Sequence, residues 1–344
     1  MTHDHQPAGF NTQSIFLILI LVISLVPDAL ANQSDSGMVV DIGDVTAIVR
    51  VPEGGNGEQF PLIIFSHGYR GSPESTNYIQ ERLKGAGYMV IAPVHLDSGE
   101  NSDDPGYNLK FPVRGDDPNT SREERFLKPE DWADESFAYR RDEINTILQW
   151  LESHHELGLQ ADLSRIGCVG HSLGGYTCMG LAGAWGTWKN WDILATAGLS
   201  PWHRPYISNN QYTDGVDDIS TPILFQSGDS EDSAVKKCLL DPDDAMAPPN
   251  DCPGYTFDQV TAPKYLQVFS KAQHSSWTDP EGDPSQDSLL RDINFYLISF
   301  LNLYVKNVHR PERQTEKAFS KLERERKNTK GPEDKLLFEH SPQP

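Results

Sequence analysis

The chain has 344 residues, a formal net charge of −21 and an apolar fraction of 37%. The length and apolar content suffice for one large α/β domain. The negative charge argues against nucleic-acid binding, because it would repel a phosphate backbone, and it suits an exported protein kept dispersed by self-repulsion.

The N-terminal segment has the pattern of an export signal. Residues 14–26 form one apolar run, and the Ala-Leu-Ala at 29–31 is a small-residue cleavage pattern. The run is too short to span a bilayer comfortably, and polar residues follow it. We therefore predict a signal peptide over 1–31, a secreted or periplasmic location and no stable membrane insertion after cleavage. The segment before the run lacks Lys and Arg, so an uncleaved anchor is the alternative.

Strand-like and helix-like patterns alternate from about residue 38 to 305. Strands are predicted where apolar residues alternate or run continuously, at 39–51, 61–65, 88–92, 165–169, 193–199, 222–226 and 264–269. Helices are predicted where apolar residues share one helical face or small residues gather, at 77–86, 131–157, 173–184 and 288–305. This order predicts an α/β fold with a mostly parallel sheet and helices on both faces.

Two polar segments depart from this alternation. Residues 97–130 are rich in Asp, Gly, Pro and Asn and too long for an ordinary connection, which predicts an inserted loop that rims a site. Residues 306–344 contain ten Lys or Arg and seven Asp or Glu. We expect a charged C-terminal tail there, either a solvated helix or a disordered extension. The folded domain is therefore predicted at 32–305.

The chain contains four cysteines. Cys238 and Cys252 bracket a polar, proline-rich loop, and in an exported protein a bridge there would close a loop of about 15 residues and stabilise by about 3 kcal/mol. Cys168 lies in a predicted strand and Cys178 in the helix that follows, and buried free thiols are favoured there over a second bridge. No spacing indicates a zinc site. The acidic clusters at 97–104, 214–218 and 241–244 lack the EF-hand pattern, so solvated loops are favoured there over calcium sites and no metal is expected.

Residues 170–174 read Gly-His-Ser-Leu-Gly and match the G-x-S-x-G pattern. A predicted strand precedes them and a helix of small residues follows, which is the context that a nucleophile elbow requires. The glycines leave room for a sharp turn that lifts the hydroxyl of Ser172 above the carboxyl edge of a sheet. A structural Gly–Ser turn is the alternative, and we expect a nucleophile.

A serine hydroxyl needs a base to take its proton. His274 follows a predicted apolar strand and precedes the last helix, and we predict that it is the base. The supporting acid should follow strand 222–226. Asp232 is favoured there over Asp229, and Glu231 is a third option. The chain order of serine, acid and histidine agrees with α/β-hydrolases.

A tetrahedral oxyanion needs two backbone N–H donors. The amide after the nucleophile, that of Leu173, is one candidate. The other should come from the loop 67–71, where Tyr69 is favoured because the preceding His-Gly pair turns its amide toward the serine.

At these residues the chain resembles the α/β-hydrolase superfamily. It is similar to bacterial cutinases and poly(ethylene terephthalate) hydrolases, and to platelet-activating-factor acetylhydrolase and dienelactone-hydrolase-like esterases. The resemblance is carried by HGYRG at 67–71, GHSLGG at 170–175, LSPWHRP at 199–205, TPILF at 221–225 and HSSW at 274–277. It implies an α/β-hydrolase catalytic domain and a role for Trp202 as an aromatic wall of the acyl-binding cleft. The acetylhydrolase group often has its acid where this chain has Ser200, which again favours an acid in the later loop.

The sequence thus predicts a serine hydrolase that cleaves carboxylic esters through an acyl-enzyme, with Ser172, Asp232 and His274 as its triad. The expected partner is a small-molecule, lipid or polymeric ester of the kind that cutinases and polyesterases cleave. Neither a metal nor an organic cofactor is expected, and a monomer is expected. A phospholipid acetylhydrolase or short-chain acyl esterase is one alternative, and a non-catalytic binding module on the same fold is another.

Overall fold

The computed structural model describes residues 37–54, 57–99, 132–153, 160–201, 215–231, 259–282, 287–306 and 335–339, together with residues 157 and 257. The chain divides into two units, Met1–Ser36 and Gly37–Pro344, and every described residue belongs to the second. The predicted signal peptide at 1–31 and nearly all of the predicted insertion at 97–130 lie outside the described residues.

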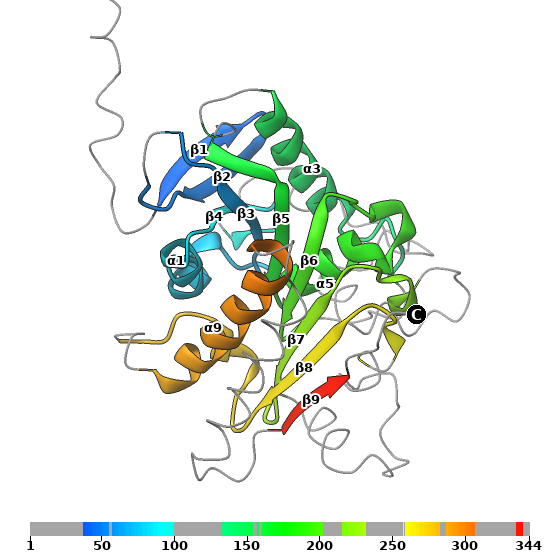
Figure 1. Cartoon of the computed structure of the whole chain (residues 1–344). Coiled ribbons are helices and arrows are strands. Elements are labelled where there is room, and N and C mark those ends of the chain that lie inside the picture. The colour runs from blue at the N-terminus through cyan, green and yellow to red at the C-terminus, as the bar shows by residue number, and fades with distance from the viewer. Residues whose placement is uncertain are drawn as a thin grey trace, which may run out of the picture. The chain divides into compact units, whose positions relative to one another are not determined.

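The second unit is built on one mixed sheet (Figure 1). Its strands are β1 (Met38–Ile42), β2 (Val45–Arg50), β3 (Phe60–Ser66), β4 (Met89–Pro93), β5 (Ala161–His171), β6 (Ile193–Leu199), β7 (Ile223–Gly228), β8 (Lys264–Phe269) and β9 (Lys335–Glu339). They lie in the order β1-β2-β4-β3-β5-β6-β7-β8-β9. The six strands from β4 to β8 in this order are parallel, whereas β1, β2 and β9 pair antiparallel with their neighbours. The predicted α/β architecture with a mostly parallel sheet is confirmed.

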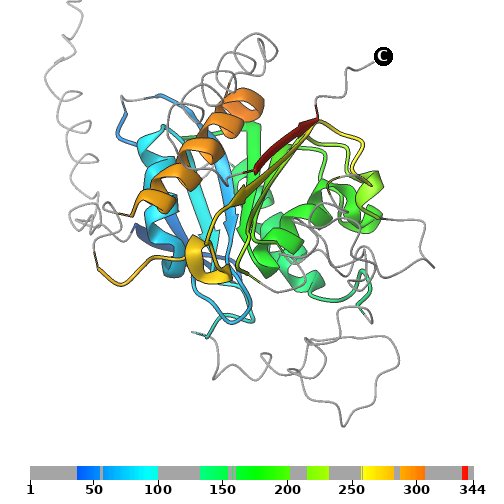
Figure 2. The ribbon, with the colours of Figure 1, turned by 90° about the horizontal axis from the view of Figure 1, so that it is seen from below.

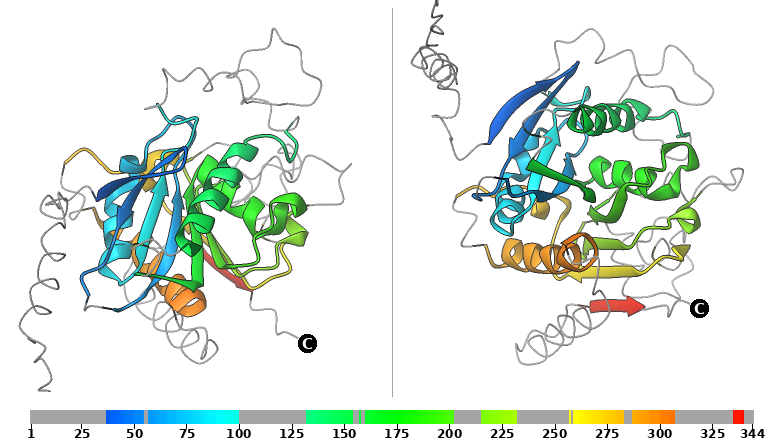
Figure 3. Two further views of the ribbon diagram at one scale, coloured as in Figure 1. Left: turned by 90° about the horizontal axis from the view of Figure 1, so that it is seen from above. Right: turned by 45° about the horizontal axis from the view of Figure 1, so that its top comes forward.

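Helices cover both faces of the sheet (Figures 2 and 3). They are α1 (Asn77–Gly85), α3 (Ala138–Glu152), α5 (Leu173–Met179) and α9 (Ser288–Leu301), and π-helical turns at Gly180–Ala184 and Asn302–Lys306 extend the last two. Short 3-10 turns lie at Pro73–Thr76, Gly186–Trp188, Val216–Asp218 and His274–Trp277. No helix among these described residues combines the length and apolarity needed to cross a bilayer.

The residues of the central strands alternate between two cores. On β3, Ile63 and Phe65 pack with α1 and α9, while Leu62 and Ile64 pack on the opposite face with α3. Successive side chains of a strand point to opposite faces, so a continuous apolar run buries both sides. The run at 61–65 therefore belongs to an interior strand of the sheet.

The carboxyl ends of the parallel strands are in register. Ser66 at the end of β3 pairs with Gly170 near the end of β5, and His171 pairs with Leu199 at the end of β6. Parallel strands end at the same edge of a sheet, and α/β proteins bind ligands outside this edge. The loops after β3, β5, β6, β7 and β8 therefore begin close together.

The C-terminal segment differs from expectation at residues 335–339. Instead of a solvated helix or disordered extension, these residues form β9, which pairs antiparallel with β8 along Lys264–Val268. Paired with β9, β8 is no longer an open edge (Figure 2). The charge of the tail dominates its composition and obscures the short apolar run Leu-Leu-Phe within it.

The interpretation of Cys168 and Cys178 as free thiols is wrong. They form a disulfide between β5 and α5, with their Cα atoms 5.6 Å apart. The turn at Ser172 folds the helix back beside the strand, so two residues ten positions apart in sequence become neighbours. The predicted bridge between Cys238 and Cys252 lies outside the described residues.

Replacing this disulfide should destabilise the protein. We expect Cys168→Ala/Cys178→Ala to lower the free energy of unfolding by about 2–4 kcal/mol, because the bridge restricts the unfolded chain. Urea unfolding of the variant and the oxidised wild type measures this. The double variant is preferred to a reductant, which would also act on a bridge between Cys238 and Cys252. Equal urea midpoints would contradict the expected contribution.

Candidate active site

Ser172 lies on the sharp turn between β5 and α5. Its backbone has φ 55° and ψ −119°, a conformation that is strained for a residue with a side chain. A Cβ at Gly174 would lie 1.9 Å from the carbonyl oxygen of Ser66, and one at Gly170 would lie 2.2 Å from the Gly174 carbonyl. The two glycines of the motif are therefore required by close backbone packing around the serine.

The structure brings Ser172 and His274 together. The serine Oγ lies 2.9 Å from the imidazole Nε2. Ser172 is only 7% exposed, whereas the side chain of His274 is 46% exposed. Ser172 is thus largely shielded from solvent, whereas solvent or a small molecule can reach the imidazole of His274.

The other side of the imidazole contacts a second hydroxyl. Ser200, the residue after β6, places its Oγ 2.6 Å from Nδ1 of His274. The same Oγ lies 2.5 Å from Oε2 of Glu231, and the other carboxylate oxygen accepts a hydrogen bond from the Gly228 N–H. Glu231 itself is 3.8 Å from Nδ1. Ser200 therefore bridges the imidazole and the carboxylate.

The carboxylate of Glu231 determines which group donates in each hydrogen bond of the series from Glu231 through Ser200 and His274 to Ser172. An ionised carboxylate can only accept, so the hydroxyl of Ser200 donates to Glu231. The Ser200 oxygen then accepts from Nδ1–H of His274. This leaves Nε2 with its lone pair directed at Ser172, which is the tautomer that can take a proton from the serine.

Three acids were considered as the partner of His274. Among the described residues, one of them is joined to the imidazole by hydrogen bonds. Asp229 contacts the hydroxyl of Ser230 and the backbone N–H of Lys271, so it completes the turn after β7. Asp232, the favoured acid, lies outside the described residues, as does Trp202. Glu231, the third option, is the carboxylate that the structure joins to His274 through Ser200.

The two predicted oxyanion segments lie beside the serine. Leu173 is the first residue of α5, where backbone N–H groups have no partner within the helix. A Cβ at Gly68 would be 3.3 Å from Cβ of Ser172, so the loop before Tyr69 touches the serine. Tyr69 itself packs edge-on against Phe137, with ring centroids 6.3 Å apart.

Two contributors to this site were missed by sequence reasoning. The sequence marks Ser200 only as a position where esterases that it resembles often carry an acid. Its place directly after β6 is the signal that its side chain could contact the imidazole of His274. His171, inside the serine motif, donates from Nε2 to the backbone carbonyl of His274 at 2.9 Å. It thereby holds the loop that carries the predicted base.

Three buried histidines surround the site and should make folding sensitive to acid. Burial lowers the pKa of His67 to about 4 and that of His171 to about 3. Burial also lowers the pKa of His95, helped by the nearby Arg140. Between these values and about 6.5, the unfolded chain binds protons that the folded protein excludes. The free energy of unfolding should therefore fall as the pH is lowered through this window, with a slope approaching about 1.4 kcal/mol per pH unit for each histidine.

Urea unfolding at pH 7, 6 and 5 measures this slope. His171→Gln is the matched variant, because a glutamine amide can replace the Nε2 donor but does not titrate. We expect a shallower dependence on pH in this variant. An unchanged slope would show that His171 does not contribute to the acid sensitivity.

Within the part of the chain that the structure describes, no group of three His, Cys, Asp or Glu side chains is arranged to hold a metal ion. What the site offers is a serine hydroxyl, an imidazole, a bridging hydroxyl and a carboxylate in one hydrogen-bonded series. Comparison of the chain with known protein families and with characterised proteins found no match.

Proposed function

We propose that the protein is a serine hydrolase of the α/β-hydrolase type that cleaves carboxylic esters through an acyl-enzyme. The observation that carries this proposal is the hydrogen bond of 2.9 Å between Ser172 Oγ and His274 Nε2, made on a strained turn at the carboxyl edge of a mostly parallel sheet. Strain at such a turn persists where surrounding packing enforces it. A strand–turn–helix of this kind is the context in which a nucleophilic serine operates.

The proposed reaction begins with proton transfer. As Ser172 Oγ attacks the ester carbonyl, its proton passes to Nε2 of His274, and Glu231 stabilises the resulting imidazolium through the Ser200 hydroxyl. The imidazolium then protonates the departing alkoxide. Water next attacks the acyl-enzyme, with His274 again taking a proton, and the carboxylic acid leaves as Ser172 regains its hydrogen.

The negative oxygen formed in each addition step needs donors. We assign this role to the backbone N–H groups of Tyr69 and Leu173, because the loop that carries Tyr69 touches the serine at Gly68 and α5 begins at Leu173. Such donors act most strongly where charge develops in the transition state. The positive end of the short helix α5 also faces the serine.

The test is burst kinetics with p-nitrophenyl acetate and longer-chain p-nitrophenyl esters. A rapid release of one p-nitrophenol per enzyme, followed by slower turnover, is the signature of an acyl-enzyme. We expect this burst in the wild type and none in Ser172→Ala. If the folded wild type hydrolyses none of these esters faster than Ser172→Ala does, the proposal is wrong.

A further inference from the structure

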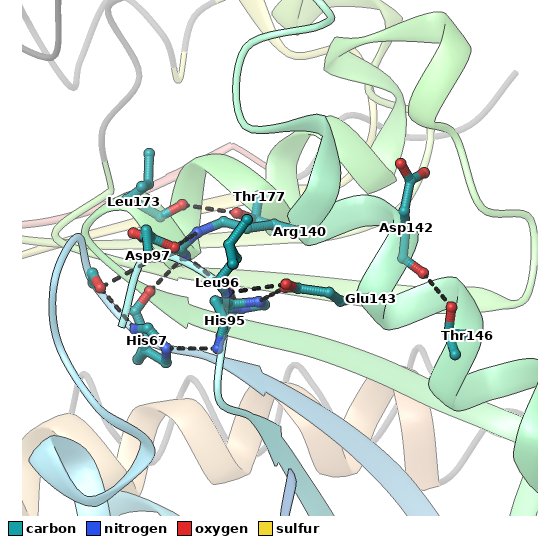
Figure 4. A network of polar contacts seen from close by, with 12 residues as sticks. His67, His95, Leu96, Asp97, Arg140, Asp142, Glu143, Thr146, Leu173 and Thr177 are labelled. Atoms are coloured by element: carbon teal, nitrogen blue, oxygen red, sulfur yellow. Dashed lines mark hydrogen bonds and ion pairs between the residues drawn. The ribbon is translucent and has the colours of Figure 1, made fainter. Parts of the chain in front are cut away.

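A buried network of charged and polar side chains lies beneath the loop after β3 (Figure 4). Its centre is Arg140 on α3, whose side chain is fully buried and paired with the equally buried carboxylate of Asp97. His67, His95 and Glu143 complete the network. None of these residues belongs to the hydrogen-bonded series that runs from Ser172 to Glu231.

Every nitrogen of the Arg140 guanidinium donates hydrogen bonds. Nε and Nη2 donate to the two oxygens of Asp97 at 2.9 and 2.8 Å. Nη1 donates to the His67 carbonyl at 2.7 Å and to Ser66 Oγ at 3.3 Å, and Nη2 donates to the Gly68 carbonyl at 3.3 Å. These five contacts equal the five N–H donors of an arginine. Three of them hold the segment 66–68, which packs against the serine turn.

The carbonyl oxygen of Gly68 is held by three donors. Besides Arg140, it contacts Nδ1 of His67 at 2.7 Å and the backbone N–H of Gly71 at 3.1 Å. The Nε2 of His67 accepts from the His95 N–H at 3.1 Å, so Nδ1 carries the proton and donates. The orientation of this carbonyl is therefore determined from several directions at once.

This carbonyl belongs to the same peptide unit as the N–H of Tyr69. A trans peptide is planar, and its C=O and N–H point in opposite directions. Drawing the Gly68 oxygen toward Arg140 and His67 turns the Tyr69 N–H the other way. The network thus determines the direction of the amide that the proposed mechanism uses for the oxyanion.

We propose that Arg140 is a positioning residue that orients the peptide between Gly68 and Tyr69 as an oxyanion donor, with Asp97 fixing its guanidinium. This inference rests on the proposed function and goes beyond it. Lysine in place of arginine keeps the positive charge beside Asp97. The single ammonium group of a lysine cannot donate to Asp97 and to the carbonyls of both His67 and Gly68 in the planar geometry of the guanidinium.

The experiment measures Arg140→Lys with Arg141→Lys as the matched control. Arg141 is the next residue on α3 and pairs at the surface with Asp142. For Arg140→Lys we expect kcat to fall by about ten- to a hundred-fold, with KM changed by less than about two-fold, because the lost interaction acts in the transition state. The inhibition constant of a trifluoromethyl ketone, which forms an oxyanion on the serine, should rise in parallel. Arg141→Lys should match the wild type in both.

A second variant covers the case in which Arg140→Lys fails to fold. Arg140→Leu/Asp97→Leu removes both charges at once, so that neither buried charge is left without its partner. It should fold by circular dichroism and show the same selective loss of kcat. If either folded variant keeps the wild-type kcat and ketone inhibition, the positioning role is wrong. Failure of the wild type to form an acyl-enzyme would instead overturn the proposed function.

Discussion

Glu231→Gln is expected to lower kcat for ester hydrolysis by about 10³- to 10⁴-fold, because it reverses the hydrogen bonds that define the imidazole tautomer. Gln can still accept from the Gly228 N–H, but its NH₂ group would then donate to Ser200. The Ser200 hydroxyl would donate in turn to Nδ1 of His274. Nε2 would then carry the proton and could not take one from Ser172.

The matched controls are Asp229→Asn and Asp232→Asn. The carboxylate of Asp229 accepts from the Ser230 hydroxyl and from the Lys271 N–H in the loop after β8. An asparagine oxygen can accept the same two hydrogen bonds, so Asp229→Asn should keep activity within about two-fold. Steady-state kinetics at pH 7 on the three variants decides the assignment. A large loss in Asp232→Asn together with a small loss in Glu231→Gln would show that Asp232 is the supporting acid.

Gly174→Ala is expected to disrupt the serine turn and to remove activity. The added methyl would lie 1.9 Å from the Ser66 oxygen and 2.5 Å from the Ser66 carbonyl carbon. Both atoms are backbone, so relief requires β3 and α5 to separate. Overpacking of this kind costs about 3 kcal/mol or more in unfolding free energy. Urea unfolding and burst kinetics measure the two effects.

Gly85→Ala is the matched control for Gly174→Ala. Gly85 is the last residue of α1, and an added methyl there meets no atom within 4 Å. It should stabilise the protein by about 0.4–1 kcal/mol, because alanine loses less backbone entropy on folding. If Gly174→Ala keeps wild-type stability and activity, the close packing of β3 on the serine turn is not needed.

Much of the fold could be predicted because its signals are local. The continuous apolar run at 61–65 and the mostly apolar run at 193–199 belong to strands buried on both faces. The disulfide between Cys168 and Cys178 was the less favoured alternative, since the sequence does not give the distance between the two side chains across the turn at Ser172. β9 was missed because the many charged residues of the segment 306–344 obscure the short apolar run Leu-Leu-Phe within it.

The site could be predicted where motif and chain order agree. Ser172 follows a strand within a recognisable glycine pattern, and His274 follows the last parallel strand, so the sequence indicated both. The choice between neighbouring acids depends on side-chain direction in the turn after β7, which sequence alone does not encode. The network around Arg140 was not predicted either, because α3 and β3 meet only in the folded chain.

The central claim is that Ser172 is an activated nucleophile, and covalent labelling of the full chain tests it most directly. The protein is treated with a fluorophosphonate, digested and examined by mass spectrometry. We predict one phosphonate adduct, on Ser172, which is absent from His274→Gln and from protein unfolded in urea before labelling. An unlabelled Ser172 in folded wild-type protein, or equal labelling of His274→Gln, would contradict the account.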